Sequence, residues 1–234
     1  MLKAQTILSD LSHLFFPKIC AGCATDIVSA NHLLCLHCLS NLNQTQFAFL
    51  KNNPVEKTWW GRMPVAAAMS QFYFAKNSLL QDLIHQLKYK GNREIGQYLG
   101  KIMGYDLQAS ERFQSLEVLM PLPLFPDKEK KRGYNQATLI CEGIAGILNL
   151  PIATGVVQRV RATDTQTHKK RMERWENVET VFATRHSRSL ENKNVLLVDD
   201  VITTGATLEA CGKVILEEVP GVQLNIATLA YADN

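Results

Sequence analysis

Two adjacent aspartates follow a strongly apolar run of the chain. The run Val195-Leu-Leu-Val leads into Asp199 and Asp200, and a turn rich in threonine and glycine, Thr203 to Thr207, comes next. At a helix N-terminus such a turn presents backbone N–H groups, hydroxyl donors and the positive end of the helix dipole, all of which attract a phosphate. Carboxylates at the carboxyl end of a strand can accept hydrogen bonds from two vicinal hydroxyls. The stretch therefore predicts a site for a ligand with a phosphate and a cis-diol, such as ribose 5-phosphate.

Each half of this stretch also has a purely structural explanation. An Asp pair can cap the turn after a strand, and a threonine-rich turn can begin a helix without binding a ligand. Taken as one arrangement, residues 195–207 favour the ligand site, although they contain neither Gly-x-x-x-x-Gly-Lys nor Gly-x-Gly-x-x-Gly. The candidate phosphate-binding residues are Thr203, Thr204, Gly205, Ala206 and Thr207.

Four of the six cysteines fall within a short N-terminal segment. Cys20 and Cys23 form one Cys-x-x-Cys pair, and Cys35 and Cys38 form a second. Two such pairs at short separation predict a tetrahedral zinc site, in which four protein sulfurs fill the coordination shell and the metal is structural. A redox dithiol and unrelated free thiols remain alternatives, but a thioredoxin-like site would need a βαβ context that this segment has no room for.

The chain that must position the aspartates alternates strands and helices. From residue 117 onward the pattern predicts strands at 117–122, 155–160, 195–199 and 223–231, and helices at 135–148 and 206–218. A strand over 65–75 and helices from residue 77 to about 91 and over 93–113 precede them. This order predicts an α/β fold with a parallel sheet flanked by helices.

We expect three segments along the chain. Residues 1–45 hold an amphipathic helix and the small zinc-binding module, residues 46–62 form a linker, and residues 63–234 form the main domain. Two basic loops, Asp127 to Arg132 and Arg159 to Arg174, are expected between the strands. Such charge runs are by themselves usually solvated surfaces.

Charge and hydropathy exclude several classes of protein. The 234 residues carry 25 Lys and Arg against 22 Asp and Glu, a net charge of +3 that does not indicate a dedicated nucleic-acid binder. The longest apolar stretch falls short of the ~20 residues of a membrane span. The N-terminal helix is interrupted by Asp10 and His13, unlike a secretion signal. We therefore expect a cytoplasmic protein without membrane insertion, whose oligomeric state is open.

The stretch around Asp199 and Asp200 resembles the phosphoribosyl pyrophosphate (PRPP) motif of type I phosphoribosyltransferases. The whole chain resembles the ComF family of competence-associated proteins, which join a four-cysteine zinc module to a phosphoribosyltransferase-like domain. Further matching segments are Leu87-Lys-Tyr-Lys-Gly91, Pro121-Leu-Pro-Leu124, Arg132-Gly-Tyr-Asn-Gln-Ala137, Gln166-Thr167 and the positions Arg174, Asn177 and Val178.

The resemblance implies a type I phosphoribosyltransferase fold and a role for each matching segment. Asp199 and Asp200 would be the catalytic pair, holding the ribose hydroxyls directly or through Mg²⁺, with the Thr203 to Thr207 turn on the 5-phosphate. The implied pyrophosphate-loop residues are Lys131, Arg132, Asn135 and Gln136, and the implied lid residues are Gln166, Thr167, Lys170, Arg174 and Asn177.

Three functions stay open from the sequence. The first is an enzyme that transfers a phosphoribosyl group from PRPP to an unidentified nitrogen acceptor and releases pyrophosphate. The second is a non-catalytic PRPP-binding adaptor or regulator that acts with competence proteins in the uptake of single-stranded DNA. The third is a nucleic-acid-binding module that uses the zinc segment and the basic lid, for which stacking aromatics are expected.

Overall fold

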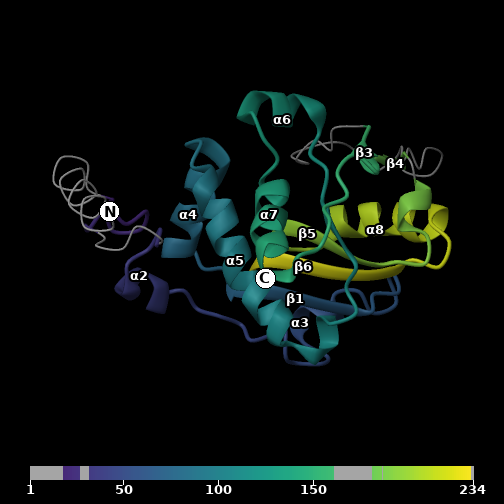
Figure 1. Cartoon of the computed structure of the whole chain (residues 1–234), viewed down its shortest axis with the longest axis horizontal. Helices are drawn as coiled ribbons and strands as arrows, with labels where there is room; N and C mark the ends of the chain where they lie inside the picture. The colour runs from purple at the N-terminus through teal and green to yellow at the C-terminus, as the bar shows by residue number, and fades with distance from the viewer. Residues whose placement is uncertain (1–17, 27–31, 161–180, 186, 233–234) are drawn as a thin grey trace, which may run out of the picture.

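The fold is built on a four-stranded parallel sheet, seen in a computed structural model (Figure 1). Its strand order is β1-β6-β5-β2. The strands are β1 (Ala67–Tyr73), β6 (Gln223–Tyr231), β5 (Asn194–Ile202) and β2 (Val118–Pro121). The structure describes residues 18–26, 32–160, 181–185 and 187–232. The α/β class and the parallel sheet expected from the sequence are confirmed.

Three helices cover one face of the sheet: α4 (Leu79–Tyr89), α5 (Arg93–Ala109) and α7 (Gln136–Leu148). The chain after α7 returns to the outer side of β2, where Ile152 forms a parallel bridge with Leu119. The β1-to-β2 and β2-to-Ile152 crossovers therefore run in the same direction across the sheet, and right-handed connections put their helices on one face. Gly100 of α5 allows this helix to pack closely on α7, because a Cβ at this position would lie 2.3 Å from the Ile140 carbonyl oxygen of α7.

The helix α8 (Ala206–Glu218) joins β5 to β6 in the opposite direction and so lies on the other face. The segment that contains α3 (Pro54–Lys57) lies beside α8. Its Met63 packs closely on that helix, because a Cβ on Gly212 of α8 would lie 2.9 Å from the Met63 sulfur. The Asn53 side chain anchors this segment by capping α3 and by donating to the Ala68 carbonyl of β1, 2.8 Å away. Residues 46–62, expected as a linker, thus pack against the sheet and α8; the division of the chain into domains stays a prediction.

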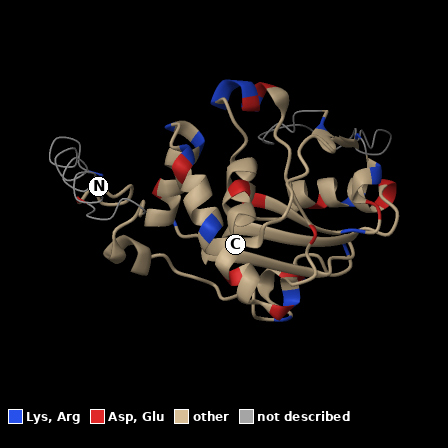
Figure 2. Ribbon diagram, in the orientation of Figure 1, with Lys and Arg blue, Asp and Glu red and all other residues tan. Residues whose placement is uncertain are grey.

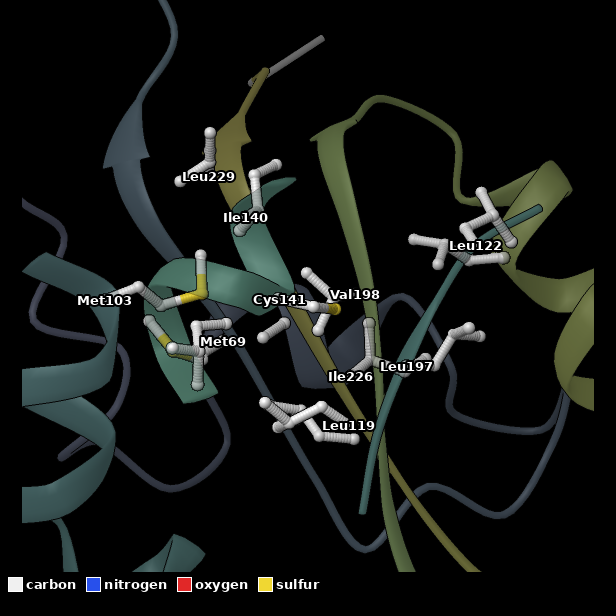
Figure 3. Packing of buried hydrophobic residues seen from close by; sticks show 14 of the residues in the cluster. Met69, Met103, Leu119, Leu122, Ile140, Cys141, Leu197, Val198, Ile226 and Leu229 are labelled. Atoms are coloured by element: carbon white, nitrogen blue, oxygen red, sulfur yellow. The ribbon is translucent and has the colours of Figure 1, made fainter. Parts of the chain in front are cut away.

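The core lies between the sheet and the α5–α7 layer. Figure 3 shows Met103 of α5 and Ile140 and Cys141 of α7 facing Met69 and Val198 of the strands. All five side chains are buried. The interior strand β5 is apolar over Val195–Val198, as expected for a parallel strand with helices on both faces. Hydrophobic burial therefore fixes β5 in the centre and leaves its polar end, Asp199 and Asp200, at the carboxyl edge.

A second, two-stranded sheet was not foreseen. The expected strand over 155–160 is β3 (Val157–Arg159), which pairs antiparallel with β4 (Phe182–Thr184) outside the main sheet. The sequence of a strand does not specify which strand it pairs with. The edge position beyond β2 is occupied by Ile152, which forms the parallel bridge there. The sequence also missed β4 and the short helices α2 (Leu36–Ser40) and α3.

The basic stretch Asp127 to Arg132, taken as a loop from sequence, is the helix α6 (Pro126–Arg132). Pro126 at its first position and Gly133 at φ +78° just after its end are typical helix boundaries. Helix α6 buries no residue, so its sequence lacks the periodic apolar positions from which a helix can be predicted. The remaining short elements are the 3-10 helices η1 (Glu111–Phe113) and η2 (Ser187–Leu190).

The cysteine segment packs against the start and middle of α4. Gln86 donates from Nε2 to the Ala21 carbonyl at 2.9 Å, and a Cβ on Gly22 would lie 2.8 Å from Leu79. The connection that follows runs antiparallel along the outer edge of β1, through a bridge between Gln44 and Phe72. The N-terminal segment is therefore joined to both α4 and the sheet.

Candidate functional site

The two aspartates lie on consecutive positions of β5 and face different surroundings. Successive side chains of a strand point to opposite faces of its sheet. Asp200 pairs with Lys88 of α4, while the charge of Asp199 acts on Cys211 of α8 and on Arg159 at the end of β3. The structure thus places one carboxylate toward each helical layer, at the carboxyl edge where parallel sheets bind ligands.

Asp199 resists ionisation. Burial, and then the neighbouring charge of Asp200, raise the pKa of the Asp199 carboxyl from 3.8 to about 7. The backbone N–H of Asp200, which donates to Asp199 Oδ1 at 2.8 Å, and the cations of Lys88 and Arg159 act in the opposite direction. A carboxyl of this kind is half protonated near neutral pH, and a cation or hydroxyl donor that arrives at the site favours its charged form.

Asp200 is held by an ion pair. Its Oδ2 lies 2.7 Å from Lys88 Nζ, and only 7% of the residue is exposed. Lys88 is in the last turn of α4, where a cation also interacts favourably with the helix dipole. The pair brings the Leu87–Gly91 segment of the sequence to the acidic end of β5.

The Thr203–Thr207 turn connects β5 directly to α8. Gly205 has φ +74°, a left-handed conformation that favours glycine, and it is the residue before the first turn of α8. The Ala206 N–H contacts Thr204 Oγ1 at 3.4 Å. Among the described residues, the backbone N–H groups of Thr203, Thr204, Gly205 and Thr207 have no hydrogen-bond partner. The turn is therefore a set of free donors at the positive end of a helix of 13 residues, which suits an anion.

The expected pyrophosphate-loop residues divide into two groups. Lys131 is exposed and Arg132 is half-buried at the end of α6, a helix that carries several basic residues (Figure 2), and the Arg132 guanidinium lies over the Tyr89 ring at 5.3 Å. Asn135 is buried and has a structural task, because it caps α7 through the Ala137 N–H and donates to the Leu122 carbonyl at 2.9 Å. Gln136 is 2% exposed, and its Oε1 has no hydrogen-bond partner in the described structure. The structure joins α6 to the end of α4, and the pyrophosphate role of all four residues stays a prediction.

A cavity of about 510 Å³ opens beyond β2. Its lining includes Pro121 at the end of β2, Asn135 and Thr138 at the start of α7, and Gln158 and Arg159 of β3. Arg159 is half-buried with its guanidinium 5.6 Å from the Phe182 ring, and burial lowers its pKa while the charge of Asp199 raises it. The cavity thus lies between α6, α7 and β3, next to a cation that interacts with the acid pair.

The expected lid lies outside the described residues. Gln166, Thr167, Lys170, Arg174 and Asn177 all fall within residues 161–180, so their roles stay predictions. The segment begins after β3 and ends before β4, two strands that pair with each other.

The four cysteines form a compact cluster. Their sulfur atoms all lie within 4.8 Å of one another, as a tetrahedral metal site requires. Backbone N–H groups donate to these sulfurs, from Cys35 to Cys20 Sγ at 3.2 Å and from Cys38 to Cys35 Sγ at 3.4 Å. The donor set, the spacing and the N–H bonds fit a structural zinc ion.

The thiols of the cluster differ in acidity. Hydrogen bonds from Thr25 lower the pKa of Cys23 to about 6, whereas burial and the neighbouring sulfurs raise the pKa of Cys38 far above its usual value. Four thiolates in contact repel one another, so all four can ionise together only around a positive ion. The remaining cysteines, Cys141 and Cys211, are buried in α7 and α8.

Sequence reasoning missed two cations beside the acid pair, Lys88 and Arg159. The signal for Lys88 was present, since it belongs to the Leu87–Gly91 run that carries the resemblance. Nothing in that run says that its lysine reaches β5, because the contact spans more than a hundred residues of chain. Arg159 was visible only as the first residue of a basic stretch.

Comparison with known proteins supports the sequence-based family assignment. A model of the phosphoribosyl transferase domain matches residues 136–234. Competence protein F of Haemophilus influenzae is 29% identical over 207 residues, 87% of this chain and 86% of that protein. Competence protein ComFC of Bacillus subtilis is 26% identical over 218 residues, 91% of this chain and 83% of that protein. The DNA utilization protein YhgH of Salmonella typhimurium is 30% identical over 137 residues, 57% of this chain and 60% of that protein.

Hydropathy adds one further observation. Within the described ranges, no helix is both long and apolar enough to cross a bilayer.

Proposed function

The chain is a homologue of the ComF-type competence proteins with a phosphoribosyl transferase domain, and on that premise we propose that it binds PRPP and transfers its phosphoribosyl group. One observation carries the proposal. The acid pair Asp199–Asp200 ends the central strand β5, and the free N–H groups of the Thr203–Thr207 turn follow at the start of α8. A sugar phosphate offers a phosphate group to the donors of the turn and hydroxyl groups to the carboxylates.

Each group of the site has a task in this reaction. The turn binds the 5-phosphate, and the acid pair accepts hydrogen bonds from the ribose hydroxyls. Carboxylate oxygens are also the ligands that Mg²⁺ prefers, so Asp199 and Asp200 fit a Mg²⁺ ion, which would neutralise the leaving pyrophosphate. The cations Lys131 and Arg132 lie on the helix that borders the cavity beyond β2, and they are our candidates for the pyrophosphate oxygens.

The reaction needs protection from water. Departure of pyrophosphate leaves an oxocarbenium-like sugar that water would capture, so a segment must cover the site during transfer. We propose residues 161–180 for this role because they follow β3, which contributes Arg159 and Gln158 to the cavity wall. The acceptor is a nitrogen compound that the geometry does not specify.

The names of the relatives suggest the setting. Two of them are called competence proteins and a third a DNA utilization protein, so we propose a role in DNA uptake for this chain. The proposal includes a cytoplasmic location, since thiolate metal sites and free thiols are usual in reducing compartments.

A non-catalytic PRPP-binding regulator is the second candidate. The relatives' names describe a cellular process and not a reaction, which is the observation that favours it. Both candidates require the same sugar-phosphate site.

The test has two stages. Calorimetric titration with PRPP and Mg²⁺ measures binding, and the protein is then incubated with PRPP, Mg²⁺ and a panel of purines, pyrimidines and amines while pyrophosphate is followed. We expect binding, pyrophosphate release with at least one acceptor, and loss of release in Asp200→Asn. Binding without release for every acceptor would favour the regulator, and absence of binding by both PRPP and ribose 5-phosphate would refute both candidates.

A further inference from the structure

The Thr203–Thr207 turn packs against a segment that lies far from it in sequence. Trp59 is 1% exposed and lies against Gly205, so close that a Cβ on Gly205 would be 2.6 Å from its ring. Thr58 contributes a second contact, at 3.2 Å from the same position. The turn therefore rests on residues that come just after α3, between the cysteine segment and β1.

Arg62 joins this segment to the turn through hydrogen bonds. Its Nη1 donates to the Thr204 carbonyl at 3.0 Å and to the Thr58 carbonyl at 3.2 Å. Its Nη2 forms an ion pair with Glu209 in the first turn of α8, and its guanidinium lies 5.8 Å from the centre of the Trp59 ring. One side chain thus contacts the segment, the turn and the helix that follows.

The bond to Thr204 fixes the direction of a donor. In a planar trans peptide the C=O and the next N–H point in opposite directions. Because Arg62 holds the Thr204 oxygen on its own side, the Gly205 N–H points to the opposite side, where it has no partner among the described residues. Without this bond the Thr204 oxygen could turn toward a bound phosphate and repel it.

Arg62 also compensates an unfavourable charge. Glu209 lies near the positive end of α8, where its carboxylate would compete with a bound anion. Hydrogen bonds from Lys213, at 2.8 Å, and from Arg62 lower the Glu209 pKa, so this carboxylate is charged and is paired with two cations. Loss of Arg62 would leave more of that negative charge next to the phosphate.

We propose that Arg62 and Trp59 are positioning residues of the 5-phosphate site, which makes binding of the phosphate depend on the segment before β1. This inference rests on the proposed function, since it concerns the same turn. It assigns a role to residues that do not touch the ligand and that belong to the stretch expected from sequence as a linker. The dependence is specific: it concerns the 5-phosphate and not the pyrophosphate.

The experiment compares two probes in the full-length protein. Ribose 5-phosphate is titrated calorimetrically in the presence of Mg²⁺, and pyrophosphate is titrated with the turn already saturated by ribose 5-phosphate. For Arg62→Met we expect an about 10-fold weaker affinity for ribose 5-phosphate and a pyrophosphate affinity within about twofold of wild type. Arg188→Met is the matched control, because Arg188 is exposed and, within the described structure, its side chain forms no hydrogen bond, ion pair or cation–π contact.

Arg62→Lys keeps the charge and serves if Arg62→Met fails to fold. A lysine lacks the planar fork that reaches Glu209 and the two carbonyls together, so we expect an intermediate loss of ribose 5-phosphate affinity. Unchanged affinity in either folded variant, or an equal loss for both probes, would overturn the inference while the proposed function stands. If the wild-type protein binds neither ribose 5-phosphate nor PRPP, the proposed function itself fails.

Discussion

Lys88 and Asp200 form an ion pair, with 2.7 Å between Nζ and Oδ2, that connects the last turn of α4 to the carboxyl end of β5. The Lys88 side chain is 22% exposed and that of Asp200 11%, so water screens the pair only weakly. Lys88 therefore supplies a positive charge to the acid pair before any ligand arrives. A metal ion or sugar phosphate that binds Asp200 has to share the carboxylate with this lysine.

Removal of Lys88 should destabilise the protein. Lys88→Met leaves Asp200 as an uncompensated charge in a site that water hardly reaches, and we expect a loss of about 3 kcal/mol in the free energy of unfolding. Urea denaturation measures this value, and the double variant with Asp200→Asn should recover most of it. Lys90→Met is the control, since Lys90 is exposed, and an equal loss there would contradict the role of the ion pair.

The acidity of Asp199 predicts a pH dependence of stability. Its pKa of about 7 in the folded protein exceeds the ordinary value of 3.8, so between these values the folded state holds a proton that the unfolded state has released. The free energy of unfolding should therefore fall as pH rises from about 4 to 7 and stay level above that. Asp199→Asn removes this contribution, so relative to wild type it should be more stable at pH 8 than at pH 5. Parallel stability curves in urea for the two proteins would contradict the raised pKa.

The conformation of Gly205 predicts a large cost for a single methyl group. Gly205→Ala introduces both a left-handed alanine and a clash with Trp59, for which we expect about 3 kcal/mol of destabilisation. Gly91 has a similar φ of +73° but open space around it, so Gly91→Ala should cost about 1 kcal/mol. Equal costs in urea denaturation would show that Trp59 does not press against the turn.

The cysteine cluster predicts one zinc ion per chain. Metal analysis of freshly purified protein should give a stoichiometry near one, and Cys38→Ser should bind far less. A chelator should lower the melting temperature of the wild type, because metal binding stabilises the segment that it organises. Cys141→Ala is the control: this thiol is buried in α7, away from the cluster, and zinc content should not change. Zinc loss in both variants, or in neither, would argue against the four-cysteine site.

The sequence by itself determined the class of fold and the local parts of the site. Alternating apolar runs and helical periodicity predict the strands and helices of the main sheet, because burial against neighbouring layers sets those patterns. Asp199, Asp200 and the Thr203–Thr207 turn are contiguous, as are the residues within each cysteine pair. Chemistry that depends on neighbours along the chain is visible in the sequence.

Only the tertiary structure decided which distant groups meet that local site. Lys88 reaches Asp200 because α4 packs on the face toward which Asp200 points, and Arg62 reaches Thr204 because its segment lies beside α8. The pairing of β3 with β4 and the helical state of α6 were equally out of reach, since strand partners and exposed helices leave no periodic apolar signal. These contacts follow from the summed packing of the whole core, which no short stretch of sequence records.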